Sequence, residues 1–167
     1  TASKVAKEAA EYEVCEAAND NDPAQVVVSG HKGAVDRAIK LAKEYGAKRA
    51  VLLPVSAPFH CSLMAHAGEV MEKALLETKF QTPKVPLVAN VLAEAVSNPD
   101  KIKNLLVKQI TGAVRWRESV IWMVENGVSE IWELGAGRAL SGMVRRIEKK
   151  LMCRAFATPE DIELLSS

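Results

Sequence analysis

Strand-type and helix-type patterns alternate through the second half of the chain, and this alternation limits its possible folds more than any other feature. Residues 129–134 predict a strand, the turn Gly135-Ala136-Gly137 follows, and residues 138–150 predict a helix. Residues 152–157 predict another strand, and 159–165 a short helix. Strands joined through helices are typical of layered α/β domains. We therefore expect an α/β domain with a largely parallel sheet.

The first part of the chain has a different order of elements. A dense turn cluster, Asn19-Asp20-Asn21-Asp22-Pro23, is followed by a β-branched run that ends at Gly30. The predicted helices before residue 129 are 2–10, 31–45, 62–79, 99–110 and 116–126. The predicted strands before residue 129 are 12–17, 25–30, 47–53 and 85–91. Up to about residue 57 the order is helix, strand, strand, helix, strand, which predicts most of a split βαβ, ferredoxin-like lobe.

Composition excludes several classes of protein. The chain has 167 residues, 26% of them charged, and a net charge of +1, so we expect one globular domain, with or without a small lobe, and no nucleic-acid partner. Its apolar runs are too short to cross a bilayer, and its start carries no secretory signal pattern, so we expect a cytoplasmic protein without a membrane partner. The start at Thr1, inside a helical pattern, is compatible with a processed or truncated piece.

The cysteines do not form a recognisable framework. Cys15, Cys61 and Cys153 are odd in number and none belongs to a C-x-x-C motif. Cys61 follows His60 directly, and side chains of adjacent residues point apart in regular structure. His66 lies six positions after His60, close to the opposite face of a helix. We therefore expect reduced thiols and no metal site.

One histidine stands where a catalytic base is often found. The predicted strand ends at Pro54, small residues and a second proline follow, and His60 comes just before the next helix. A loop between a strand and a helix can present a side chain to a cleft, and histidine titrates near neutral pH. His60 is a candidate general base, with a loop or core histidine as the alternative. No G-x-S-x-G elbow occurs, so the chain offers no recognisable nucleophile.

Two further patterns have structural interpretations. The turn at Gly135 begins like a dinucleotide fingerprint, but Leu140 occupies the third glycine position, so we expect a tight strand-to-helix turn. Arginines at predicted helix ends could bind phosphate or could simply suit a solvated helix surface. They are Arg115, Arg117, Arg145 and Arg146.

Several motifs, taken in order, resemble those of the malonyl-CoA:acyl-carrier-protein transacylases. They are NDNDPAQVVVSGH at 19–31, PVSAPFHCSLM at 54–64, VPLVANV at 85–91, VKQI at 107–110, VRW at 114–116 and ELGAGRALSG at 133–142. The resemblance spans essentially the whole chain, and the combination is specific although no single motif is.

The resemblance implies an acyltransferase of fatty-acid biosynthesis. Such a transferase moves malonyl from coenzyme A to the phosphopantetheine thiol of acyl carrier protein through a serine acyl-enzyme, so malonyl-CoA is a substrate and no separate cofactor is implied. His60 matches the catalytic histidine, acting as general base and then acid. Gln109 occupies the position whose backbone carbonyl orients that histidine. Asn21 falls in the segment that lines the cleft.

Part of the family's pattern has no counterpart in these residues, namely its N-terminal glutamine, its G-H-S-x-G serine and its substrate-binding arginine. The resemblance therefore implies most of a ferredoxin-like small lobe at 1–57, and the C-terminal part of an α/β-hydrolase-like acyltransferase lobe at 58–167. We expect the chain alone to be inactive, with the missing N-terminal part or a second copy as a further partner. The alternatives are an acyl-carrier-protein-binding module and a fragment without a function of its own.

Overall fold

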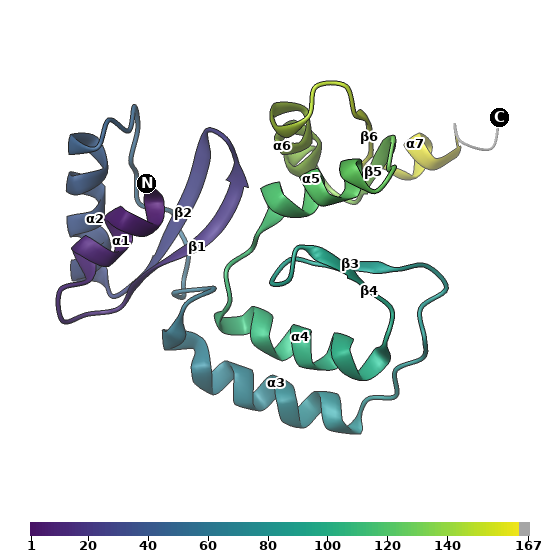
Figure 1. Ribbon diagram of the computed structural model, residues 1–167, viewed down its shortest axis with the longest axis horizontal. Helices are drawn as coiled ribbons and strands as arrows, with labels where there is room; N and C mark the ends of the chain where they lie inside the picture. Colours follow the sequence, from purple (N-terminus) through teal and green to yellow (C-terminus); the bar gives the residue numbers. More distant parts are fainter. Residues whose placement is uncertain (164–167) are drawn as a thin grey trace.

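A computed structural model describes residues 1–163 and has the mixed α/β architecture that the sequence predicts (Figure 1). Its helices are α1 (Ala2–Ala10), α2 (Lys32–Glu44), the 3-10 turn η1 (Ser62–Met64), α3 (Ala65–Glu77), α4 (Pro99–Thr111), α5 (Trp116–Glu125), α6 (Ala139–Ile147) and α7 (Pro159–Glu163). Its strands are β1 (Cys15–Asp22), β2 (Gln25–Gly30), β3 (Leu87–Ala89), β4 (Glu94–Val96), β5 (Glu130–Leu134) and β6 (Met152–Phe156). The described strands form three two-stranded sheets, of which β1–β2 and β3–β4 are antiparallel and β5–β6 is parallel.

The first cluster consists of the β1–β2 hairpin with α1 and α2 packed on one side of it (Figure 1). Small side chains let these elements approach closely, and Arg37 of α2 donates to the carbonyl oxygens of Ala9 and Ala10 at 2.8 and 3.2 Å. These carbonyls end α1 and have no partner within the helix, so Arg37 stabilises that end. The buried core is Val5, Ala6, Ala9, Cys15, Ala34 and Ala38.

The second cluster pairs α3 with α4 beside the β3–β4 hairpin (Figure 1). Asn98 caps α4, because its Oδ1 accepts from the backbone N–H of Lys101 at 2.8 Å, and Pro99 occupies the first turn. Buried Ile102 and Leu105 of α4 pack with Val96 of β4. Together these features fix the direction of α4, whose far end carries Gln109.

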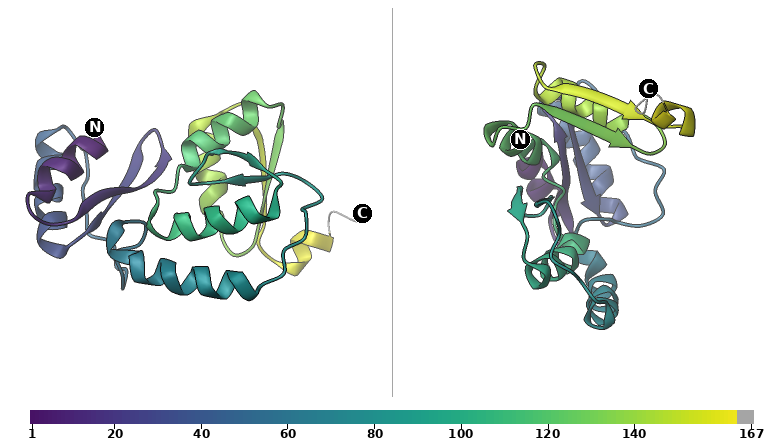
Figure 2. Two further views of the ribbon diagram at one scale, coloured as in Figure 1. Left: turned by 60° about the horizontal axis from the view of Figure 1, so that its bottom comes forward. Right: turned by 90° about the vertical axis from the view of Figure 1, so that its right-hand side faces the viewer.

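The third cluster packs α5 and α6 against the parallel β5–β6 pair, with Val120, Val144 and Leu151 at its centre. Gly135 and Gly137 have φ values of 132° and 91°, so this segment is the tight strand-to-helix turn expected from the sequence. Figure 2 shows the β1–β2 hairpin reaching from the first cluster toward this one, and β1 contacts both α5 and α6.

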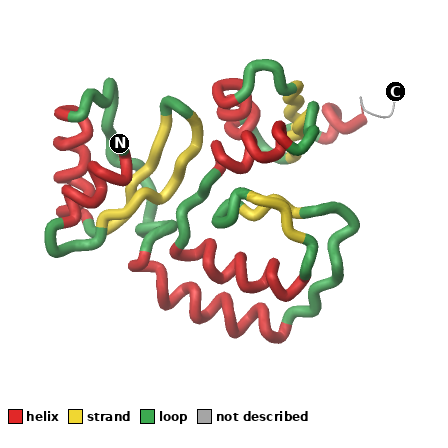
Figure 3. The backbone as a smooth tube through the Cα atoms, viewed as in Figure 1, coloured by secondary structure: helices red, strands yellow, loops and turns green. Residues whose placement is uncertain are grey.

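Several sequence predictions are wrong in detail. Residues 47–53 were expected to form a strand, but residues 45–61 run as a loop between α2 and η1 (Figure 3). No neighbouring strand pairs with them among the described residues, and an apolar run needs such a partner to become a strand. The turn cluster at 19–22 is instead the end of β1, and the turn itself lies at Pro23 and Ala24.

Other differences concern extent. The expected helix over 62–79 is divided into η1 and a shorter α3, and β4 had no strand-type signal. Among the named strands of residues 1–163, the parallel pairing expected to dominate occurs between β5 and β6. One isolated parallel bridge also joins Asn19 of β1 to Val114. The last predicted helix is present as α7, and residues 164–165 lie outside the described part of the chain.

Candidate active site

His60 lies at the end of the long loop, directly before η1, in an unusual backbone conformation. Its φ is 59°, in the left-handed region that residues other than glycine rarely adopt. Such a conformation persists only where neighbouring contacts impose it, and it is common at functional sites. His60 therefore needs contacts that hold it in this conformation.

The imidazole of His60 is held by the end of α4. Its Nδ1 lies 3.0 Å from the main-chain carbonyl oxygen of Gln109. The last four carbonyls of a helix lack partners within the helix, so this oxygen is free to accept. Because a carbonyl can only accept, Nδ1 carries the proton, and Nε2 of the neutral ring is left as a hydrogen-bond acceptor and base.

The chain next to His60 is anchored from two other directions. Cys61 is fully buried, and its thiol donates to the carbonyl oxygen of Pro58 at 3.1 Å. Ser62 contacts Glu16 of β1: the Ser62 hydroxyl donates to Oε1 at 2.6 Å, and its backbone N–H donates to Oε2 at 3.1 Å. Sequence reasoning missed the contact with Glu16, because no motif links residues 46 positions apart.

Asn21 lies at the end of β1, half-buried, between two aspartates that join the first cluster to the third. Asp20 accepts hydrogen bonds from Arg117 of α5: Nε lies 3.0 Å from each carboxylate oxygen, and Nη2 lies 2.6 Å from Oδ2. Asp22 accepts a hydrogen bond through its Oδ2 from Nε of Arg146 of α6 at 2.9 Å. The position of Asn21 is therefore set by ion pairs on both sides of it.

The four arginines considered for phosphate binding contact protein groups. Besides Arg117 and Arg146, Arg115 pairs with Glu118, and Arg145 reaches the Cys153 carbonyl oxygen at 3.5 Å. The guanidinium groups of Arg115, Arg117 and Arg146 already contact carboxylates. The structure thus favours a structural role for these three arginines over phosphate binding.

The other two histidines lie apart from His60. His31 precedes α2 and is exposed, and its Nδ1 accepts from the backbone N–H of Val14 at 2.9 Å. His66 is on the exposed side of α3, and its side chain is 88% accessible. It therefore serves as a matched control for experiments on His60.

The three cysteines are free thiols, and burial is the main cause that raises the pKa of Cys15. Within residues 1–163, no group of three or more histidine, cysteine or acidic side chains is placed to hold a metal ion. In the same range, no helix combines the length and apolar character needed to span a membrane.

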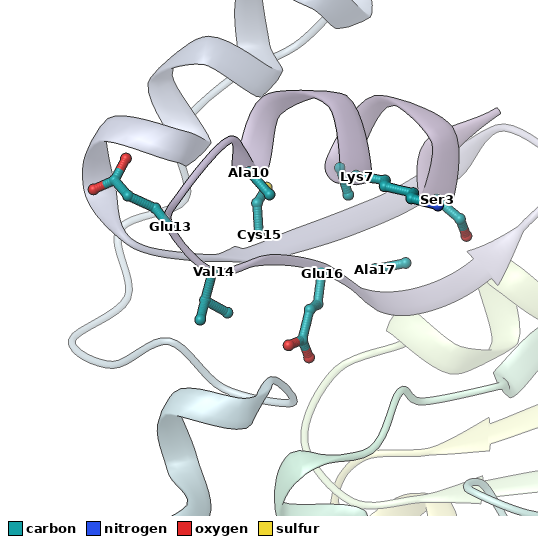
Figure 4. A pocket seen from close by; sticks show the side chains of 9 residues that line it. Ser3, Lys7, Ala10, Glu13, Val14, Cys15, Glu16 and Ala17 are labelled. Atoms are coloured by element: carbon teal, nitrogen blue, oxygen red, sulfur yellow. The ribbon is translucent and has the colours of Figure 1, made fainter.

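A shallow pocket lies between α1 and the beginning of β1, and neither His60 nor Gln109 lines it. Its lining includes Ser3, Lys7, Ala10 and Cys15 (Figure 4). Small and apolar side chains dominate it, so it offers no catalytic group comparable with His60.

No family model matches the chain, but individual proteins do. It is 42% identical over 157 residues to the malonyl CoA-acyl carrier protein transacylase of Escherichia coli K12, covering 94% of this chain and 51% of that protein. The transacylase of Bacillus subtilis is 40% identical over 147 residues, covering 88% of this chain and 46% of that protein.

Solved structures agree with these relatives. The acyl-carrier-protein-S-malonyltransferase of Bartonella henselae is 46% identical, with a TM-score of 0.93, covering 98% of this chain and 52% of that one. A malonyl-transacylase solved in complex with a type II polyketide synthase acyl-carrier protein is 37% identical, with a TM-score of 0.93, covering 99% of this chain and 54% of that one. The resemblance to malonyl transacylases is thereby confirmed, and the chain spans about half of the length of the relatives that it matches.

Proposed function

We propose that this chain forms the histidine-bearing half of the active site of a malonyl-CoA:acyl-carrier-protein acyltransferase. The contact between His60 Nδ1 and the Gln109 carbonyl oxygen carries this proposal, because it leaves Nε2 free as a base. The names of the relatives support malonyl transfer as the reaction, and malonyl-CoA and acyl carrier protein as substrates. Acyl-CoA as donor also suits a cytoplasmic location.

In this mechanism Nε2 of His60 removes the hydroxyl proton of a serine as its oxygen bonds to the malonyl thioester carbon. The carbon–sulfur bond breaks, and the imidazolium returns the proton to the departing coenzyme A thiolate. In the second half, Nε2 takes the proton of the phosphopantetheine thiol, whose sulfur attacks the acyl-serine. The proton then returns to the serine oxygen, so the enzyme is regenerated.

The serine would come from polypeptide outside these 167 residues, which contain no G-x-S-x-G. Large apolar side chains that a folded enzyme normally buries support this part of the proposal. Leu52, Leu53 and Val55 of the loop before His60 are exposed, as are Trp132 and Leu134 of β5. An exposed apolar surface next to an unpaired strand edge marks where further protein packs. The relatives are about twice as long, which leaves room for such a segment.

The proposed division of the chain follows the same comparison. Residues 1–57 would form most of a ferredoxin-like small lobe and residues 58–167 part of a hydrolase-like acyltransferase lobe. Asn21, fixed between Asp20 and Asp22, would line the cleft between them. The carrier-protein complex of a relative supports acyl carrier protein as the acceptor.

The test uses a chimaera in which this chain replaces the matching half of the Escherichia coli relative. Radiolabelled malonyl-CoA should leave acid-stable label on the chimaera and none on the chain alone, and the chimaera should pass the label to acyl carrier protein. A folded chimaera without label would contradict the proposal. Carrier binding by the chain, without any transfer by the chimaera, would favour a carrier-binding module instead.

A further inference from the structure

We propose that Glu16 is a positioning residue for His60, holding the loop that carries the imidazole through a two-point contact with Ser62. The role builds on the proposed function, in which His60 is the base. Glu16 lies on β1 of the first cluster, and Ser62 begins η1, which leads into α3. The contact therefore joins two clusters at a point two residues beyond His60.

Both oxygens of the Glu16 carboxylate are used on Ser62. Oε1 accepts from the hydroxyl at 2.6 Å and Oε2 from the backbone N–H at 3.1 Å. Cys61, the residue that precedes η1, makes no side-chain capping hydrogen bond. Glu16 thus supplies from a distant strand the cap that a local serine or aspartate usually gives, and its negative charge suits a helix N-terminus.

The direction of the side chain agrees with this role. Figure 4 shows Cys15 directed toward Ala10 of α1, and Glu16 directed to the opposite side of the strand. Successive residues of a strand face opposite sides, so burial of Cys15 in the first cluster sends Glu16 away from it. Glu16 has no salt bridge within residues 1–163, which distinguishes it from an ordinary surface ion pair.

The backbone of His60 explains why a second anchor is needed. A left-handed φ of 59° is unfavourable for histidine, so the loop must be held on both sides of this residue. Cys61 and Pro58 hold one side through the 3.1 Å thiol contact, and Glu16 holds Ser62 on the other. With both anchors in place, the ring meets the Gln109 carbonyl oxygen at 3.0 Å.

The first test reads the tautomer of His60 directly. Long-range proton–nitrogen spectra of the labelled chain are recorded about two pH units above the ordinary histidine pKa, with His60 assigned through its absence in His60→Ala. The wild-type ring should have its proton on Nδ1. Glu16→Ala should shift the nitrogen signals of His60 toward a mixture of tautomers, because the loop no longer holds the ring against the Gln109 carbonyl oxygen. Glu69→Ala on α3 is the control: it removes the 3.4 Å contact with His66 and should leave the nitrogen signals of His60 unchanged.

Two milder variants keep the proposal testable if Glu16→Ala does not fold. In Glu16→Gln the amide oxygen can still accept from the Ser62 N–H while its NH₂ donates to the hydroxyl, so the wild-type spectrum should be largely recovered. Ser62→Ala removes the hydroxyl contact alone and should give an intermediate shift. If both folded variants and Glu16→Ala keep the wild-type nitrogen signals, Glu16 has no positioning role.

The second test measures transfer by the chimaera. Glu16→Ala should lower kcat about tenfold with little change in KM for malonyl-CoA, and Glu16→Gln should restore most of it. An unchanged kcat would overturn the positioning role, even if His60→Ala abolishes transfer and upholds the proposed function. If His60→Ala leaves transfer intact, the proposed function is wrong. The role of Glu16 in catalysis is then wrong as well, whatever the nitrogen spectra show.

Discussion

The carboxylate of Asp22 lies 2.8 Å from the guanidinium of Arg146, although the two residues are 124 positions apart in the chain. The Asp22 side chain is 0% exposed, whereas that of Arg146 is 49% exposed. Asp22 also accepts from the backbone N–H of Ala24 at 2.8 Å. This pair joins β1 to α6, and with it the first cluster to the third.

The two partners should differ in how much their loss costs. Arg146→Met leaves a buried carboxylate without its cation and should lower the free energy of unfolding by about 3 kcal/mol. Asp22→Asn leaves a half-exposed guanidinium that water can solvate, so the loss should be nearer 1–2 kcal/mol. Urea denaturation of both variants near neutral pH measures this. An equal cost for the two would contradict the asymmetry of burial.

The same pair should make stability depend on pH. Burial by itself raises the pKa of Asp22, but the hydrogen bonds from Arg146 and Ala24, with the Arg146 charge, outweigh it and leave the pKa below its usual value. A carboxyl group with a lowered pKa stabilises the fold fully above its unfolded pKa of about 3.9 and loses that contribution as the pH falls through its folded pKa. Asp22→Asn should therefore lose less stability than wild type between neutral and acid pH. Parallel acid-stability curves for the two proteins would refute this.

Two glycine-to-alanine changes should have opposite effects. A Cβ on Gly112 would lie 2.7 Å from a Val91 methyl carbon and 2.8 Å from the Lys108 carbonyl oxygen. The end of α4 must then shift, and Gln109 with it, so stability should fall by about 2 kcal/mol and chimaera activity about tenfold. Gly142 lies inside α6, where an added Cβ would have its nearest neighbour, a guanidinium nitrogen of Arg146, at 3.6 Å.

Gly142→Ala is the matched control, and it should raise stability by about 0.5–1 kcal/mol because alanine loses less backbone entropy in a helix. Thermal unfolding of both variants gives the sign of each change. A stabilising Gly112→Ala would show that the end of α4 has room that the structure does not give it.

A smaller side chain at the centre of the third cluster should lower the free energy of unfolding. Val120 is completely buried between α5 and its neighbours, so Val120→Ala should cost about 2 kcal/mol through lost burial and a residual cavity. Val70 on α3 is 55% exposed, and Val70→Ala should stay within about 0.5 kcal/mol of wild type. Similar losses for both changes, measured by denaturant unfolding, would place the core elsewhere.

Helices were predictable from the sequence where local signals define them. Asn98 and Pro99 begin α4, and Gly46 follows the end of α2 close to the expected position. Strands were less predictable, because pairing depends on distant residues. The apolar run at Val51, Leu52 and Leu53 forms no strand. The aspartates at the end of β1 have the composition of a turn, but in the fold they pair with Arg117 and Arg146.

The candidate site shows the same division. A loop histidine before a helix marks His60 in the sequence, and the family motif points to Gln109. Glu16 gives no such signal, because its partner Ser62 is brought to it only by the fold. Residues that position a catalytic group from another element are therefore the part of a site that a single sequence leaves hidden.

The most direct test of the account compares His60→Ala with His66→Ala in the chimaera. Transfer of labelled malonyl to acyl carrier protein should fall by about 10³-fold or more in His60→Ala, because the base that activates serine and thiol is lost. It should stay at the wild-type level in His66→Ala, whose side chain is exposed on α3. Equal transfer by the two folded variants would contradict the assignment of His60 as the base.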